Sequence, residues 1–114
     1  MTKVEIDPGI CGFVTTVEAT AIENDEDIPV KEVHVKVKSG CASIQRMMGD
    51  LGDTFDAYKL LWVAPGQGLF YDYAASHEFD PDVGCPIICG IIKCIEVECD
   101  IALVKDSYIR FIKE

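Results

Sequence analysis

Two stretches with the composition of β-strands, separated by an acidic turn, constrain the fold of this chain most strongly. Residues 13–22 are rich in β-branched side chains and show no helical period. Residues 33–38 alternate between valine and charged or polar side chains, as in a strand with one buried face. With the acidic turn at 23–27, the pattern predicts an antiparallel hairpin, and a short strand at 3–6 is expected at its edge.

Two helical segments are expected after the hairpin. Residues 42–48 have helix-forming composition and place apolar side chains at the i, i+3, i+4 spacing of one helical face. Glycines then interrupt the pattern, and a second helical piece is expected at 54–62, with its aromatic residues and leucines buried. Residues 64–84 contain five glycines or prolines and little periodicity, so this segment is expected to be the longest irregular one.

The last third of the chain predicts one long helix and a terminal strand. Pro86 suits the first turn of a helix, so we expect Cys85 at the N-cap and a helix that runs to about Cys99. Residues 103–112 have the composition of a strand. The expected order is β-β-β-α-α-loop-α-β, a single α+β domain over 1–114 with helices on one face of a small, mainly antiparallel sheet.

Composition and charge narrow the classes of partner. A hydrophobic fraction of 49% with 26% charged residues is typical of a globular domain. The formal charge of −10 repels phosphate backbones and excludes nucleic acid as an expected partner. Residues 1–7 lack the apolar core of a secretory signal, and no run approaches the roughly 18 apolar residues of a membrane span. We therefore expect a cytoplasmic protein that contacts no membrane.

The expected cytosolic location indicates which chemistry the six cysteines favour. Cytosolic thiols are normally reduced, so cysteine clusters there more often bind metals or carry out redox chemistry than form disulfides. Along one helix Cys89, Cys94 and Cys99 are too far apart to pair with one another without breaking it. The sequence therefore favours metal binding or thiol chemistry.

Three of the cysteines share a local setting. Cys11, Cys41 and Cys85 each stand beside a glycine, at a point where an expected element begins or ends. A helix N-terminus favours a thiolate, and both Cys41 and Cys85 are expected there. The three are candidate ligands for zinc or an iron–sulfur cluster, which are soft and prefer thiolates. The alternative is that they are ordinary core residues.

A fourth ligand has two candidates. Cys89 lies one helical turn from Cys85 and about 40° away around the axis. His77, in the expected loop, would complete a Cys₃His set, although an isolated surface histidine is more often only solvated. Cys94 points to the opposite side of the helix and Cys99 is roughly 21 Å along it, so both are expected to pack against apolar neighbours.

The three cysteines also carry a resemblance. Cys11-Gly12 before the hairpin, Gly40-Cys41-Ala42-Ser43 between strand and helix, and Cys85 opening a late helix resemble the iron–sulfur cluster assembly scaffold family of the IscU/NifU type. The resemblance implies that Cys11, Cys41 and Cys85 hold a transient cluster or zinc. Phe13 and Gly84 stand where that family has an aspartate and a histidine, which indicates a more permanent site. The chain is also similar to small uncharacterised proteins of anaerobic microbes.

Three hypotheses follow from these patterns. The first is a metal or iron–sulfur cluster binding protein, with a scaffold or carrier role. The second is a redox or transfer enzyme in which Cys41 or Cys85 is the activated thiol. The third is an interaction subunit whose cysteines only pack, and in each case a homodimer or a larger redox complex is a plausible assembly.

Overall fold

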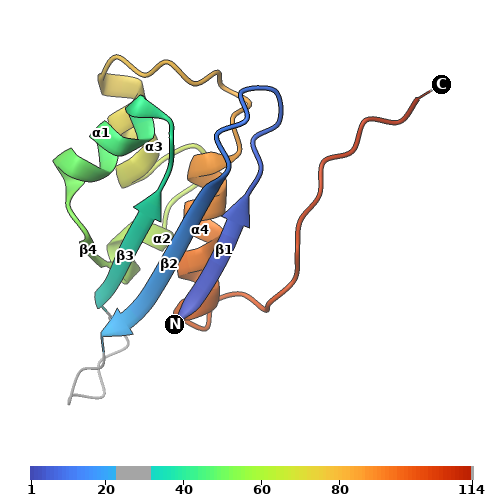
Figure 1. Ribbon diagram of the computed structural model, residues 1–114. Helices are drawn as coiled ribbons and strands as arrows, with labels where there is room; N and C mark the ends of the chain where they lie inside the picture. Colours follow the sequence, from blue (N-terminus) through green and yellow to red (C-terminus); the bar gives the residue numbers. More distant parts are fainter. Residues whose placement is uncertain (23–31, 114) are drawn as a thin grey trace.

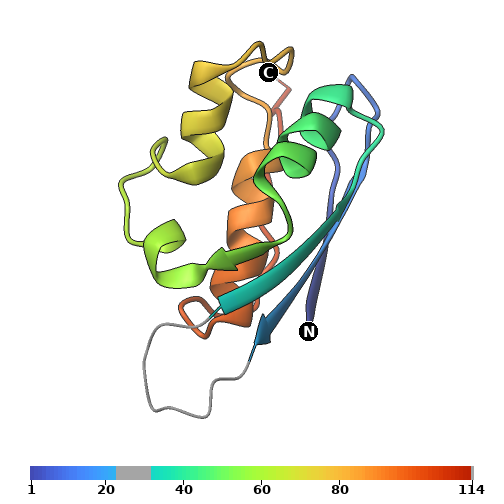
Figure 2. The same cartoon turned by 90° about the vertical axis from the view of Figure 1, so that its left-hand side faces the viewer.

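The chain folds into one antiparallel sheet with helices on one face. The computed structural model describes residues 1–22 and 32–113. Its elements in chain order are β1 (Thr2–Ile6), β2 (Thr15–Ile22), β3 (Glu32–Lys38), α1 (Ala42–Leu51), β4 (Thr54–Asp56), α2 (Ala57–Leu61), α3 (Leu69–Ser76) and α4 (Ile87–Glu98). The strands lie in the order β1-β2-β3-β4, all antiparallel (Figures 1 and 2). The expected α+β class is confirmed.

The predicted hairpin is the centre of the sheet. β2 pairs with the whole of β3 from Thr16 to Ile22, with Ala19 opposite Val35 and Ala21 opposite Val33. Val33, Val35 and Ala19 are fully buried, whereas the residues between them face solvent or are half-buried. The period-two alternation therefore does select the core face, as expected for a strand with one buried side. The acidic turn predicted at 23–27 lies outside the described residues.

Helix α4 supplies much of the core against this sheet. Its buried residues are Ile87, Ile88, Ile91, Cys94 and Ile95. A Cβ atom at Gly90 would lie 2.3 Å from Cδ1 of Ile6, so the missing side chain lets β1 approach the helix. The predicted helix and the burial of Cys94 are confirmed. The helix begins at Ile87 with Pro86 as its N-cap, which places Cys85 one residue outside it.

The segment expected to be helical over 54–62 is only partly so. Residues Thr54–Asp56 form β4, which pairs with the first residues of β3. Phe55 lies opposite Val33 and is buried, so pairing with an open strand edge outweighs local helical propensity. Tyr58 and Trp62, expected in the core, are instead 49% and 65% exposed. The two rings pack on each other, with centroids 5.6 Å apart.

Two further expectations are corrected. Residues 64–84 contain the helix α3, whose Phe70 packs edge-on against Phe55 with ring centroids 5.4 Å apart. The eight-residue helix has too short a pattern to be recognised beside its flanking glycines. Residues 103–112, expected to form a strand, have no strand partner among the described residues. They extend away from the body of the molecule (Figure 1).

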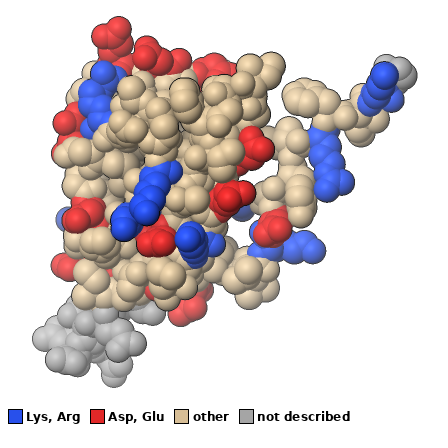
Figure 3. Space-filling model, in the orientation of Figure 1, with Lys and Arg blue, Asp and Glu red and all other residues tan. Residues whose placement is uncertain are grey.

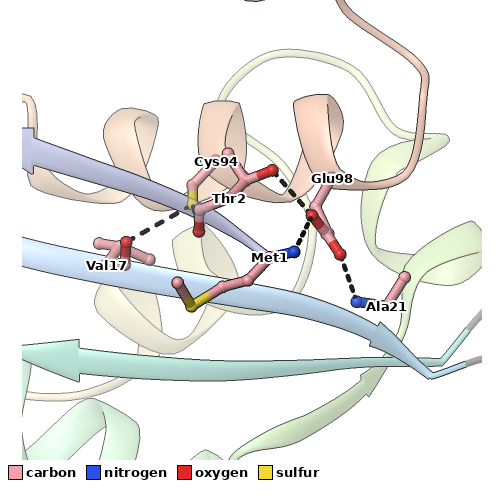
Figure 4. A network of polar contacts seen from close by, with 6 residues as sticks. All are labelled: Met1, Thr2, Val17, Ala21, Cys94 and Glu98. Carbon is pink, nitrogen blue, oxygen red and sulfur yellow. Dashed lines mark hydrogen bonds and ion pairs between the residues drawn. The ribbon is translucent and has the colours of Figure 1, made fainter.

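A polar network fastens the end of α4 to the sheet (Figure 4). Glu98 accepts hydrogen bonds from the Thr2 hydroxyl at 2.8 Å and from the Ala21 N–H at 2.7 Å. The N-terminal ammonium of Met1 lies 3.6 Å from the same carboxylate. The Cys94 thiol donates to the Thr2 carbonyl at 3.3 Å, and burial raises the pKa of this thiol to about 11, so it stays protonated.

The same contacts lower the pKa of Glu98. Burial acts to raise it, but the Ala21 N–H, the Thr2 hydroxyl and the N-terminal ammonium outweigh burial and leave it below its ordinary value. A carboxyl group with a depressed pKa in the folded state stabilises the fold above its unfolded pKa. That contribution is lost as the pH falls through the folded pKa.

We expect Glu98→Gln to lower the free energy of unfolding near neutral pH by about 1 kcal/mol, because two charge-assisted hydrogen bonds become neutral ones. The difference from wild type should shrink as the pH falls from about 7 to about 3, since the wild-type carboxylate becomes protonated. Urea unfolding of both proteins at several pH values measures this difference in free energy. Glu96→Gln on the same helix is the matched control and should change little, whereas a pH-independent loss in Glu98→Gln would contradict the assignment.

Candidate metal centre at the thiol end

Three connections between elements meet at one end of the molecule. β1 and β3 run toward this end, so the loop from β1 to β2 and the junction from β3 to α1 both lie there (Figure 1). Helix α4 starts at the same end. These connections carry Cys11, Cys41 and Cys85 respectively, and we call this region the thiol end.

The loop from β1 to β2 presents Cys11 at its tip. Its turn is closed by the Gly12 N–H, which donates to the Gly9 carbonyl at 3.0 Å. Asp7 accepts from the Gly9 N–H at 2.9 Å and holds the start of the turn. Gly9 and Gly12 have φ values of +95° and +73°, a region that other residues rarely adopt. The Cys11 side chain is exposed, as a ligand or a reactive thiol requires.

A buried hydroxyl chain fixes the junction that holds Cys41. The Cys41 N–H donates to the Ser39 hydroxyl at 3.1 Å. The fully buried Thr15 hydroxyl is hydrogen-bonded to the Ser39 hydroxyl at 2.9 Å and donates to the Phe13 carbonyl at 3.0 Å. This chain joins the Cys11 loop to the Cys41 junction, although the two are about thirty residues apart in sequence.

Cys41 is the N-cap of α1, as expected. Its carbonyl accepts the first helical hydrogen bond, from the Gln45 N–H at 3.0 Å. The half-buried thiol makes no capping hydrogen bond. The preceding Gly40 is required by packing, because a Cβ atom there would lie 2.8 Å from the Phe13 ring. Phe13 thus covers the backbone beside Cys41, a role that the sequence did not indicate.

Cys85 is the third cysteine of the thiol end and precedes α4. Its N–H donates to the Asp82 carbonyl at 3.0 Å in the turn before α4. Burial raises the pKa of its thiol, a hydrogen bond from the Ile87 N–H lowers it, and the charges of Asp82, Cys11 and Cys41 raise it further. Cys85 is therefore close enough to Cys11 and Cys41 for their charges to raise the pKa of its thiol. Elements far apart in sequence bring these three predicted residues together.

Tyr71 of α3 is a neighbour of the thiols that sequence reasoning missed. Burial raises the pKa of its hydroxyl, and the charges of Cys89 and Cys85 raise it further. Tyr71 therefore lies beside both cysteines at the start of α4, where Cys89 is exposed. No motif indicated Tyr71, because its segment was expected to be an irregular loop.

The His77 side chain contacts residues at the end of α3. Its ring stacks on Tyr73, with centroids 3.9 Å apart and an interplanar angle of 11°. Its Nδ1 lies 2.9 Å from the Tyr73 carbonyl and 3.0 Å from the Ser76 hydroxyl. Within the described part of the chain these contacts include no cysteine, so ligation by His77 stays a prediction.

The described residues contain neither a metal-holding group of side chains nor a membrane-spanning helix. Across residues 1–22 and 32–113, no three His, Cys, Asp or Glu side chains are spaced to hold a metal ion. Over the same residues, no helix has the length and apolar character needed to cross a bilayer.

The fold and the thiol end together define a small α+β protein, a four-stranded antiparallel sheet with helices on one face and three cysteines gathered at one end. The chain belongs to the family described as "Family of unknown function (DUF6951)", which matches residues 2–111. Comparison with curated proteins and with solved structures found no match. The matched region includes all six cysteines and nearly all of the C-terminal segment.

The raised pKa of Cys85 predicts how alkylation of its thiol depends on pH. In metal-free protein we expect alkylation of Cys85 to rise at a higher pH than for an ordinary cysteine, because only the thiolate reacts. Asp82→Asn should move that midpoint toward the ordinary value, since one of the charges that raise the pKa is removed. Mass-spectrometric mapping of alkylation against pH measures both effects. Asp80→Asn is the matched control, and equal midpoints in all three proteins would contradict the prediction.

Proposed function

We propose that the thiol end binds a soft metal, as an iron–sulfur cluster or as zinc, through Cys11, Cys41 and Cys85. The observation that carries this proposal is that the fold places Cys85, just before α4, at the same end of the molecule as the loop with Cys11 and the junction with Cys41. Thiolates are the ligands that zinc and iron–sulfur clusters prefer. Three thiols of separate origin at one end of a small domain are the ligand set that such a cofactor needs.

A single ion and a cluster require different distances between the thiols. Around a tetrahedral zinc with Zn–S bonds of about 2.3 Å, neighbouring sulfurs are about 3.8 Å apart. No three potential ligands among the described residues have single-ion spacing. A cluster of several irons and sulfides is larger and suits a more open set of thiols. The exposed Cys11, in a turn with two glycines of positive φ, is the ligand best able to adjust its position.

The electrostatics of Cys85 also favour metal binding over thiol catalysis. An activated catalytic thiol has a lowered pKa, whereas burial and three nearby groups raise that of Cys85. A bound cation removes the repulsion among the thiolates and displaces the Cys85 proton. The site is therefore poorly suited to act as a free thiolate nucleophile and well suited to bind a cation with loss of protons.

Four exposed apolar side chains lie in the same loops as Cys11 and Cys85, namely Ile10, Phe13, Val14 and Val83. For a fourth ligand we favour Cys89 over His77. Cys89 is exposed on the first turns of α4 and shares Tyr71 as a neighbour with Cys85, whereas the His77 ring is stacked on Tyr73.

The test is elemental analysis with a visible spectrum on protein purified and reconstituted without oxygen. We expect iron and sulfide with thiolate-to-iron charge-transfer absorption for a cluster, or about one zinc per chain for the alternative. Cys85→Ser and Cys11→Ser should each lose most of the bound metal. Cys99→Ser is the matched control, since it removes a thiol at the far end of α4, and it should retain the metal.

Circular dichroism on each variant separates loss of metal from loss of folding. Cys11 is exposed, so its substitution should leave the fold intact and gives the cleaner result. Full metal retention in folded Cys11→Ser and Cys85→Ser would overturn the proposal, as would wild-type protein that binds neither iron nor zinc. Comparing Cys89→Ser with His77→Ala identifies the fourth ligand.

A further inference from the structure

The C-terminal segment 103–112, which we call the tail, leaves the end of α4 and runs away from the body (Figure 1). Six of its ten residues are large apolar side chains with exposures between 67% and 99%, namely Leu103, Val104, Tyr108, Ile109, Phe111 and Ile112. So much contiguous apolar surface is unusual for a folded chain and marks a site of interaction.

The tail is already extended. The Tyr108 hydroxyl donates to Asp106 at 3.4 Å, and the Arg110 guanidinium lies 4.6 Å from the centre of the Tyr108 ring. Contacts between residues i and i+2 on one side of the backbone are typical of a strand, in which alternate side chains share a face. The tail is therefore extended, and among the described residues it has no partner strand.

The sheet has an open edge next to the point where the tail begins. β1 is an outer strand and pairs only with β2 in the described structure. The N-terminus of β1 lies beside the end of α4, to which Glu98 fastens it (Figures 1 and 4). A strand edge of unpaired N–H and C=O groups is a ready template for another strand.

The net charge of the tail, compared with that of the rest of the chain, indicates which partner the tail binds. Residues 103–114 contain three of the ten Lys and Arg residues and two of the twenty Asp and Glu residues, a net charge of +1. The other 102 residues therefore carry −11. Basic side chains stand out along the tail in Figure 3, apart from the body. A second copy of this chain offers both features that the tail complements, an acidic body and an open β1 edge.

We propose that two copies of this chain form a dimer by strand exchange, in which the tail of each copy pairs with β1 of the other. Each tail starts beside its own β1, so a two-fold arrangement across the β1 edges brings it to the partner's edge. Exchange of both tails would bury more than about 1,000 Å², enough for a stable interface. It would also cover an edge that otherwise invites non-specific pairing.

Sedimentation velocity on the full chain tests this, with a thiol reductant present to exclude disulfide-linked dimers. We expect a species of twice the chain mass over about a hundredfold range of concentration.

Ile109→Asp and Phe111→Asp should each weaken the dimer at least about tenfold, because they place a charge in the apolar contact. Both side chains are exposed in the single copy, so folding should not change. Val83→Asp, at an equally exposed apolar position away from the tail, is the matched control and should leave the dimer intact.

Hydrogen exchange identifies the pairing itself. Amides of the tail and of β1 should be protected at high concentration and should lose that protection together on dilution. A chain that stays monomeric at every concentration would overturn the proposal, as would a dimer that survives both tail substitutions. Tail protection that does not depend on concentration would show that the tail folds back on its own β1, and the proposal would then be wrong.

Discussion

The packing of α4 on the inner face of the sheet is the interaction on which the rest of this structure depends. Ile91 and Ile95 are fully buried between the helix and the strands. The approach is close because Gly90 has no side chain, and Ile6 of β1 occupies the space. Since one rigid helix spans the molecule, this contact fixes both of its ends. Cys85 is held at the thiol end, and Glu98 is held beside the N-terminus.

Cys85 and Cys94 show how burial and local partners set the chemistry of two thiols. Cys94 in the middle of the helix is buried, donates to a backbone carbonyl and has a pKa of about 11, so its role is packing. Cys85 also has a raised pKa, but part of the cause is the charge of two other thiols. Repulsion among neighbouring thiolates is the condition that a bound cation relieves. One inert thiol thus lies within α4, and a thiol suited to a ligand set lies just before its N-terminus.

The family match over residues 2–111 includes both the thiol end and nearly all of the tail. An edge strand and an extended apolar segment are each unfavourable when exposed, and pairing one with the other resolves both. The proposed dimer places its contacts at β1 and the tail. The thiol end is a separate surface, so the proposed metal binding and the proposed dimer can be tested independently with separate variants.

The sequence alone determined the elements whose local pattern agrees with their final environment. The valine alternation of β3 and the apolar face of α4 were both predictable, as were the positions of Cys11, Cys41 and Cys85 at the boundaries of elements. Tertiary structure decided the rest. Phe55 lies in a strand because β3 offered an open edge, and α3 is held by the packing of Phe70 on Phe55. The tail, whose composition predicted a strand, is not part of the sheet. The nearness of three thiols likewise follows from strand directions and the packing of α4, which are long-range contacts that no short window of residues encodes.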